Sequence, residues 1–321
     1  MPKTQTAFDR CIVIFNPVST CAKRMEWRIA ELAQLFPGDS LVVLHTSADG
    51  RAANAELLVR QAAKLGPRTL LAIIAGDGTI NELVNTLLHD KRLSSEARQT
   101  VLLPLWGGNG NDLAHMVNGR RRRRPVHRLL AVGRAVAVHP ITFQLGTVNG
   151  QMQRVSAVSY ASFGASAYTA HQLDQAELGP TWTHLLPGVR FLHELVLVVW
   201  AMIRAPRSKI IIDGVEQAVY EQLFINGSRF AKVSALALPI TKKTFCYARV
   251  INKHPLSILR AISELVRGYQ MDDADTSQGS IFVLQADTWA QFDGEVVELS
   301  AGTRVSAGLS PRLVRILSTK Y

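Results

Sequence analysis

Short apolar runs alternate with longer segments of helical spacing over the first 120 residues of the chain. The short runs are typical of buried strands. Four are expected, at residues 11–15, 41–44, 69–74 and 101–105. Apolar residues at intervals of three and four predict helices at residues 22–36, 52–65, 80–88 and from Asn111 onward. This alternation predicts an α/β domain with a parallel sheet and helices on both of its faces.

The rest of the chain holds more strand-like segments than helical ones. Strands are expected at residues 135–148, 154–160, 209–213, 220–225, 245–250, 280–284, 289–292 and 313–317. Helices are expected at residues 189–203 and 256–267. We therefore expect two domains, an α/β domain at residues 1–134 and a mostly antiparallel β domain at residues 135–321. The pattern leaves open whether the last strand returns to the first domain.

The composition is that of an ordinary globular protein. Of the 321 residues, 47% are hydrophobic and 19% are charged, which excludes wholesale disorder. Three scattered cysteines are too few for a disulfide framework or a zinc site, so a reducing compartment is expected. The N-terminal segment lacks the charged region and long apolar stretch of a signal peptide. We expect a cytoplasmic protein, and the sequence leaves a homodimer open.

The net charge of +11 suits anionic partners such as phosphorylated small molecules, acidic membranes or nucleic acid. The apolar run at residues 195–203 is too short to cross a bilayer, which takes roughly 20 helical residues. Five consecutive arginines at residues 120–124 form either a solvated loop or an attractive site for anionic lipid head groups. No interleaved aromatic residues accompany them, so a nucleic-acid partner is not expected. Peripheral association with an anionic membrane surface is the expected membrane relationship.

A glycine-containing loop directly follows the third predicted strand. It reads Ala75-Gly76-Asp77-Gly78-Thr79-Ile80-Asn81-Glu82. Small residues let backbone N–H groups approach a phosphate, and the helix that begins near Thr79 offers its positive end to an anion. Asp77 would repel a bare phosphate, so its place indicates a bridging Mg²⁺ or a base that faces an acceptor hydroxyl. A plain turn with a helix cap is the alternative interpretation.

A second glycine-rich loop follows the fourth predicted strand. It reads Gly107-Gly108-Asn109-Gly110-Asn111-Asp112. Taken alone, it could be a flexible turn with a capping Asn or Asp. Ligands of parallel sheets bind beyond the carboxyl ends of the strands, where both loops lie. Neither loop matches a dinucleotide fingerprint, and the chain has no Gly-Lys dipeptide, so a Walker-type loop is excluded.

Three segments, in this order, resemble the signatures of the diacylglycerol kinase and sphingosine kinase catalytic domain. They are Asn16-Pro17-Val18-Ser19, Gly76-Asp77-Gly78-Thr79-Ile80-Asn81-Glu82 and Gly108-Asn109-Gly110-Asn111-Asp112. Further matches are Thr46, Phe224-Ile225-Asn226-Gly227 and Phe292-Asp293-Gly294-Glu295. The resemblance extends over nearly the whole chain. The Gly-Asp-Gly-Thr element alone also occurs in NAD kinases and phosphofructokinases, so the combination is what makes the resemblance specific.

The resemblance implies an ATP-dependent lipid kinase that acts on a diacylglycerol- or sphingoid-like lipid. It places the nucleotide in the α/β domain and the lipid in a C-terminal β-sandwich domain. The implied ATP contacts are Asn16, Pro17, Ser19, Thr20, Thr46, Ala75, Gly76, Gly78, Thr79, Ile80, Asn81, Glu82, Gly108, Asn109 and Gly110. Asp77 would bind Mg²⁺, and Asp293 and Glu295 would reach back from the second domain. Glu295 is the implied proton acceptor for the lipid hydroxyl, and Asp77 is the competing candidate.

The sequence departs from the family's pattern at several positions. Ala75 and Thr20 replace glycines that the family usually has, and Trp106-Gly107 look like extra residues before the second loop. Bacterial members usually carry paired aspartates after Asn226-Gly227 that bind a structural Mg²⁺. Residues 238–243 contain no acid, so this second metal site is not expected.

Two other functions stay open at the level of sequence. One is a kinase of a soluble substrate such as NAD, and the other is a non-catalytic member that binds nucleotide or lipid. Asn81-Glu82 and the second glycine loop favour the lipid kinase, whereas the departures at Thr20 and Ala75 keep the non-catalytic interpretation alive.

Overall fold

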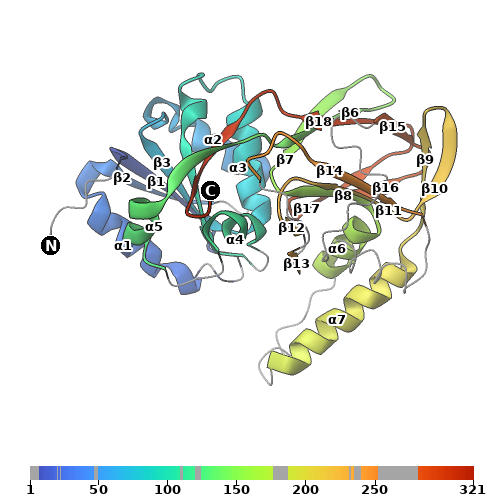
Figure 1. The fold of residues 1–321 in the computed structure, drawn as a ribbon, viewed down its shortest axis with the longest axis horizontal. Helices are drawn as coiled ribbons and strands as arrows, with labels where there is room; N and C mark the ends of the chain where they lie inside the picture. The colour runs from blue at the N-terminus through green and yellow to red at the C-terminus, as the bar shows by residue number, and fades with distance from the viewer. Residues whose placement is uncertain are drawn as a thin grey trace.

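The computed structural model describes residues 7–19, 21, 23–46, 50–108, 111–119, 124–175, 187–230, 233–234, 240–251 and 281–321. They form an α/β half built on one mixed sheet and a β half in which two antiparallel sheets share one core (Figure 1). The fold class predicted from the sequence is therefore confirmed. No helix in the described part of the chain is both long enough and apolar enough to cross a membrane.

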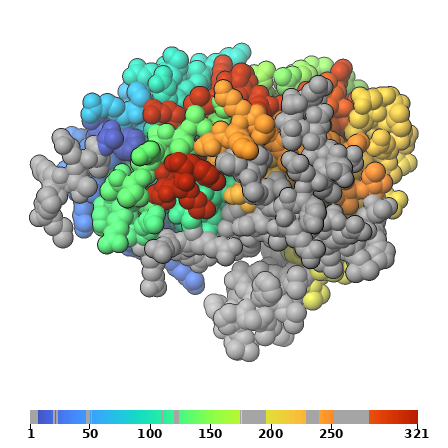
Figure 2. Space-filling view, viewed as in Figure 1, coloured from blue at the N-terminus to red at the C-terminus, as the bar shows by residue number. Residues whose placement is uncertain are grey.

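Sheet A has the strand order β2-β1-β3-β4-β19-β5. Its strands are β1 (Arg10–Phe15), β2 (Leu41–His45), β3 (Thr69–Ala75), β4 (Val101–Trp106), β5 (Arg134–Val138) and β19 (Val314–Ser318). All neighbours pair in parallel except β5, which runs antiparallel to β19. Figure 2 shows the red C-terminal end of the chain beside green residues of the α/β half. Sheet A thus draws strands from both sides of the predicted division at residue 134.

Helices cover both faces of sheet A. They are α1 (Trp27–Leu35), α2 (Arg51–Val59), α3 (Asp77–His89), α4 (Asp112–Asn118) and α5 (Val126–Val132), with 3₁₀ helices η1 (Lys23–Met25), η2 (Gly38–Ser40), η3 (Ala62–Lys64) and η4 (Ala97–Gln99). Alternate residues of each strand enter different cores: Ile12 packs with α2 and α3, and Val13 packs with α1 and α5. Strands buried on both faces read as continuous apolar runs, which explains the pattern in the sequence.

Sheets B and C form the β half. Sheet B has the order β10-β9-β15-β18-β6-β7 and sheet C the order β14-β11-β8-β16-β17. Their strands are β6 (Ile141–Gly146), β7 (Met152–Ala157), β8 (Tyr160–Gly164), β9 (Ser208–Ile212), β10 (Val215–Val219), β11 (Glu221–Ile225), β14 (Cys246–Val250), β15 (Ile281–Leu284), β16 (Thr288–Phe292), β17 (Glu295–Leu299) and β18 (Arg304–Leu309). Both sheets contribute phenylalanines to one core, among them Phe143, Phe163 and Phe292, whose rings lie 5.1–5.7 Å apart.

Two helices and a pair of two-residue antiparallel strands complete the described chain. They are α6 (Ala165–Gln175), α7 (Pro187–Arg204), β12 (Arg229–Phe230) and β13 (Val233–Ser234). Helix α6 lies on the outer side of sheet C, and α7 packs on α6 and extends from the lower edge of the molecule (Figure 1).

Several boundaries differ from those expected. The strand predicted at residues 135–148 is two strands, β5 in sheet A and β6 in sheet B, because Pro140, which lacks an N–H donor, separates them. The strand predicted at residues 154–160 likewise divides into β7 and β8. The helix predicted at residues 22–36 begins only at Trp27, after η1. The helix predicted at residues 256–267 lies outside the described residues.

Candidate active site

The first glycine loop turns directly from β3 into α3, with Gly76 as the N-cap of the helix. Every residue of β3 is buried within sheet A. Because the turn follows the last residue of this strand, it lies at the carboxyl edge of the sheet. A Cβ atom on Gly78 would meet nothing within 4 Å. The unobstructed backbone at Gly78 and the positive end of α3 suit the binding of a phosphate group.

Gly107 and Gly108 hold the second loop against the first. A Cβ atom on Gly107 would lie 2.4 Å from the backbone nitrogen of Ala75, and one on Gly108 would lie 2.4 Å from the Cα of Gly76. Side chains do not fit at such distances from a backbone. Gly107, which looks like an extra residue in the sequence, therefore allows the two loops to touch.

The side chain of Asn111 holds the second loop by hydrogen bonds to its backbone. Its side-chain oxygen accepts hydrogen bonds from the backbone N–H groups of Gly107 and Gly108, each at 3.0 Å. Its backbone has a φ of 55°, a conformation that asparagine adopts more readily than most residues. Asn109 and Gly110 lie outside the described residues, so their ATP contacts stay predictions.

Asp77 links the two loops through its carboxylate. The backbone N–H of Asp112 donates to Oδ2 at 3.1 Å, and that of Leu113 donates to Oδ1 at 3.4 Å. Burial, together with the charges of Asp112 and Asp293, raises the pKa of Asp77 to about 7, and the two N–H donors oppose this shift. The site therefore concentrates negative charge where a divalent cation would relieve it.

The residues at this point fit a Mg²⁺ ion that is shared with a bound phosphate. Carboxylate oxygens are the hard ligands that Mg²⁺ prefers, and the ion commonly takes one or two carboxylates together with substrate phosphates and water. Within the described ranges, no group of three or more His, Cys, Asp or Glu side chains could hold a metal alone. Asp77 would hold the ion only together with the nucleotide.

The turn after β1 reaches the same edge of the sheet. The side-chain amide of Asn16 donates to the Thr79 hydroxyl at 3.1 Å, and its oxygen accepts the Val18 N–H at 3.1 Å. The N–H of Thr46, after β2, donates to the Phe15 carbonyl at 3.0 Å. The other predicted contacts in this turn are Pro17, Ser19 and Thr20, of which Thr20 lies outside the described residues. The ends of β1, β2 and β3 thus lie together, and the segment that begins at Asn16 lies beside the first glycine loop.

The side chains that follow Thr79 face the protein. Ile80 is buried in the core beneath sheet A, and the Glu82 carboxylate accepts a hydrogen bond from Asn54 of α2 at 2.9 Å. The Asn81 amide donates to the Ser156 carbonyl of β7 at 2.7 Å. Their side chains brace α3, and any contact with ATP stays a prediction.

Asp293 is a buried connector between the halves of the protein. It is 3% exposed and has a φ of 48° in the turn between β16 and β17. Its carboxylate accepts hydrogen bonds from the Asn81 amide at 2.9 Å and from the backbone N–H groups of Val158 at 2.5 Å, Ser159 at 2.8 Å and Tyr160 at 2.9 Å. Burial raises the pKa of this carboxyl, and the four donors oppose the shift. Both of its oxygens are thus engaged in holding α3 and the turn after β7.

Gly294, in the same turn as Asp293, lies beside the first glycine loop. A Cβ atom on Gly294 would lie 3.8 Å from the backbone nitrogen of Gly78 and 3.9 Å from the Cβ of Asp77. Glu295 is the next residue, at the start of β17, and is partly buried. The structure therefore brings the Asp293-Gly294-Glu295 segment of the β half against the phosphate-loop candidate of the α/β half.

One face of α3 carries polar residues that the sequence analysis did not single out. The Asn85 side chain accepts the Ser156 N–H at 2.7 Å and donates to the Ser156 carbonyl at 2.9 Å. A ring nitrogen of His89 lies 2.9 Å from the Ser156 hydroxyl. Burial, together with the charges of nearby arginines, lowers the pKa of His89 to about 4. The spacing of Asn81, Asn85 and His89, four residues apart, was the available signal for this polar seam.

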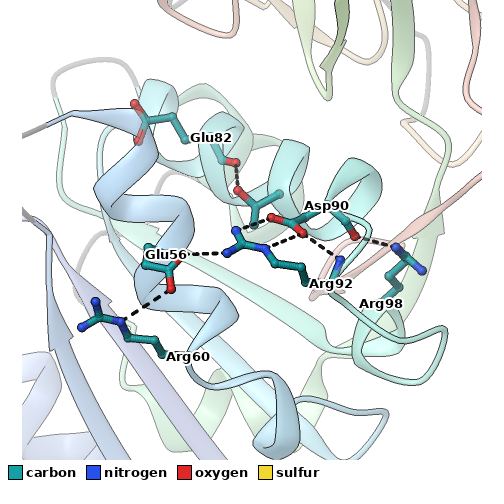
Figure 3. Close-up of polar contacts among 7 residues, drawn as sticks. Glu56, Arg60, Glu82, Asp90, Arg92 and Arg98 are labelled. Atoms are coloured by element: carbon teal, nitrogen blue, oxygen red, sulfur yellow. Dashed lines mark hydrogen bonds and ion pairs between the residues drawn. The ribbon is translucent and has the colours of Figure 1, made fainter.

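The far end of α3 is held by arginines (Figure 3). Arg98 donates to the carbonyls of Leu87 at 3.1 Å and Asp90 at 2.6 Å, where a cation complements the negative end of the helix. Arg92 bridges the Asp90 and Glu56 carboxylates at 2.8 and 2.7 Å, which ties α3 to α2 (Figure 3). Exposed ion pairs contribute only about 0–1 kcal/mol each. The hydrogen bonds from Arg98 to the last carbonyls of α3 are therefore expected to stabilise this end of the helix more than the exposed ion pairs of Arg92.

Comparison with known proteins tests the family resemblance that the two glycine loops indicate. Residues 10–143 match the family model of the diacylglycerol kinase catalytic domain. This match confirms the predicted resemblance. It implies a kinase that uses ATP, and it does not establish the acceptor. No curated protein matches the sequence significantly.

Solved structures share the fold of this chain. A diacylglycerol kinase from Bacillus anthracis str. Sterne is similar with a TM-score of 0.67 and 16% identity, over 98% of this chain and 99% of that chain. Yeast NADH kinase complexed with NADH is similar with a TM-score of 0.51 and 8% identity, over 96% of this chain and 83% of that chain. At these identities the structures show a shared fold.

The remaining predicted features are described only in part. Of the five arginines, Arg124 alone lies within the described residues, and its guanidinium donates to the Thr319 hydroxyl at 3.2 Å. In the segment at residues 238–243, which is expected to lack a second metal site, residues 238 and 239 lie outside the described residues. Ile240 is fully buried and shares an apolar cluster with Met116 of α4, which anchors this segment on the α/β half.

Proposed function

We propose that this protein is an ATP-dependent lipid kinase, which transfers the γ-phosphoryl group of ATP to a hydroxyl of a diacylglycerol- or sphingoid-like lipid. The observation that carries the proposal is the approach of Gly294 to Asp77 and Gly78. Because a turn of the β half lies against the phosphate-loop candidate, a nucleotide on the first half and an acceptor on the second would meet there.

The glycine loops supply the positioning that phosphoryl transfer requires. Gly78 leaves room for phosphate oxygens, and α3 directs its positive end toward them. Asp77 is fixed by two backbone donors at the junction of the loops, which suits it to hold Mg²⁺ with the phosphates. When bound, Mg²⁺ neutralises phosphate charge, which together with positioning is most of what such catalysis needs.

Glu295 is the proposed proton acceptor. In the reaction, the lipid oxygen bonds to the γ-phosphorus, the bond from that phosphorus to the ADP oxygen breaks, and the hydroxyl proton passes to the Glu295 carboxylate. Asp293 is already engaged by four donors, which supports a positioning role for it. A partly buried carboxylate next to this fixed turn is well placed to orient a hydroxyl.

One experiment separates the lipid kinase from its alternatives. The purified protein is incubated with radiolabelled ATP, Mg²⁺ and one of three acceptors: diacylglycerol in mixed micelles, sphingosine in mixed micelles, or soluble NAD. We expect label in a lipid fraction and none in NAD. Label in NAD alone would support the soluble-substrate kinase, to which the fold of NADH kinase lends some weight. No label in any acceptor would favour a non-catalytic protein.

A further inference from the structure

Helix α7 presents a stripe of apolar side chains that the described part of the chain leaves uncovered. Val196 is 57% exposed, Val199 45%, Trp200 46% and Ile203 49%. Their spacing of three, four and seven residues places them on one face of the helix. Large apolar side chains scattered singly over a surface are normal, whereas four in one row mark an interaction site.

The opposite face of α7 fixes the direction in which this stripe points. Ala201 is buried, and α7 packs along α6. The hydroxyl of Tyr220, the residue before β11 of sheet C, donates to the carbonyl of Met202. The helix is therefore anchored on the β half by one side, and the exposed stripe lies on the other side of the helix. The helix itself extends from the lower edge of the molecule (Figure 1).

Positive charge gathers at the C-terminal end of the stripe. The Arg204 guanidinium lies 4.0 Å from the centre of the Trp200 ring, and Arg207 and Lys209 follow as exposed residues. No aspartate or glutamate occurs from residue 195 to residue 209. Tryptophan and arginine are both suited to the boundary between lipid chains and head groups.

We propose that α7 is a docking helix that lies in the interface of an anionic lipid bilayer, with the stripe Val196, Val199, Trp200 and Ile203 among the upper acyl chains. The inference rests on the proposed lipid-kinase function, since it assigns the surface through which that activity would reach its substrate. Interfacial helices of this kind bury their apolar face about 5–10 Å deep. Arg204, Arg207 and Lys209 would lie at the level of the lipid phosphates, where each basic residue contributes about 1 kcal/mol.

A second copy of this chain is a poorer occupant of the stripe. Four half-exposed side chains fall well short of the roughly 800 Å² per partner that a stable protein interface buries. The cluster of cations at the end of the stripe, in a segment without Asp or Glu from residue 195 to residue 209, favours an anionic surface over an identical basic one.

The test measures binding to vesicles by flotation. Vesicles of pure phosphatidylcholine are compared with vesicles that contain 30% phosphatidylglycerol. We expect binding to the anionic vesicles that weakens as salt rises, because screening reduces the attraction of the arginines. The double variant Val199→Ser/Ile203→Ser should bind at least tenfold more weakly. The control Val132→Ser/Val148→Ser removes exposed valines elsewhere and should bind as the parent does.

Fluorescence and turnover complete the test. Vesicles should shift the tryptophan emission of the parent to shorter wavelength, and Trp200→Phe should lose this shift. Circular dichroism verifies that each variant is folded. Equal binding by parent and the Val199→Ser/Ile203→Ser variant overturns the proposal, as does a dimeric parent that this variant converts to a monomer without loss of vesicle binding.

The docking proposal can fail separately from the kinase proposal. A short-chain diacylglycerol dissolved as monomers requires no docking, so the α7 variant should phosphorylate it at the parent's rate and lose activity only on vesicles. Unchanged activity on vesicles would refute docking by α7 and leave the kinase standing. Absence of turnover by the parent on every lipid would refute the lipid-kinase proposal.

Discussion

The side-chain amide of Asn81 donates a hydrogen bond to the carboxylate of Asp293 at 2.9 Å, although 212 positions separate the two residues. Asn81 lies in the first turns of α3, and Asp293 lies in the turn between β16 and β17. The same carboxylate receives three backbone N–H groups from the start of β8 and the turn before it. This buried contact, together with the seam between α3 and Ser156, holds the β half, and Glu295 with it, beside the first glycine loop.

The first prediction concerns Asp293→Asn. The substitution places an NH₂ group where a carboxylate oxygen accepts at least two N–H donors, so at least one donor loses its partner. We expect a loss of about 1–3 kcal/mol in the free energy of unfolding, measured by denaturant titration. Asp287→Asn is the matched control, because exposed Asp287 accepts a single N–H from Ala301 at 2.8 Å and asparagine keeps that acceptor. Equal effects of the two variants would contradict the connecting role of Asp293.

A second prediction compares Gly108, which packs against the first loop, with Gly78, which is expected to face the phosphate. Gly108→Ala places a methyl group 2.4 Å from the Cα of Gly76, so the loops must move apart at a cost of about 1–3 kcal/mol in stability. Gly78→Val adds bulk where no protein atom lies within 4 Å of the Cβ position. Its stability should change far less, whereas ATP affinity measured by calorimetry should fall at least tenfold. Normal ATP affinity in folded Gly78→Val would exclude this loop as the phosphate site.

Local patterns in the sequence predict much of the fold, and non-local contacts account for what they miss. Sheet A is predictable because its buried strands form continuous apolar runs separated by helical spacing. The join between β4 and β19 pairs segments over two hundred residues apart, and no local pattern specifies such a partner. Pro140 was a visible sign of the break between β5 and β6, but the apolar residues on both sides suggested one continuous strand.

The candidate site shows the same division. The two glycine loops and the turn at residues 293–295 are recognisable in the sequence by their residue types. The packing role of Gly107 and the four donors on Asp293 depend on contacts between distant segments, so they appear only once the chain is folded. Ser156 gives no sequence signal at all, because its part in the seam with α3 rests mainly on its backbone groups.

A third prediction concerns Glu221, a buried carboxyl behind α6. Its Oε2 atom accepts the Ser166 N–H at 2.6 Å, and its Oε1 atom has no hydrogen-bond partner among the described residues. Burial raises the pKa of Glu221 from 4.5 to about 8, against the effect of the hydrogen bonds from residues 165 and 166. The folded protein therefore holds a proton that the unfolded chain releases between these two values. Stability should fall as the pH rises from about 4.5 to about 8.

Glu221→Gln removes this titration and keeps an oxygen that can accept the Ser166 N–H. The variant should resemble the parent near pH 5 and exceed it near pH 8.5 by an amount on the order of a few kcal/mol. Thermal unfolding at both pH values measures the difference. Glu216→Gln, at an exposed position of β10, is the control and should not change the pH dependence. A constant offset between Glu221→Gln and the parent at all pH values would contradict the assigned titration.

The last prediction assigns separate roles to Glu295 and Asp77. Glu295→Gln keeps the shape of the side chain and removes the base, so turnover should fall roughly 10²–10⁴-fold while ATP affinity stays normal. Asp77→Asn removes the negative charge that a cation needs, so it should lower both turnover and the Mg²⁺-dependent part of ATP affinity. Glu298→Gln, at an exposed position on the same strand as Glu295, is the matched control and should keep full turnover. Each variant is measured for turnover and, by calorimetry, for ATP affinity with and without Mg²⁺. Near-normal turnover in Glu295→Gln, together with an inactive Asp77→Asn that binds Mg²⁺-ATP normally, would reverse the roles and make Asp77 the base.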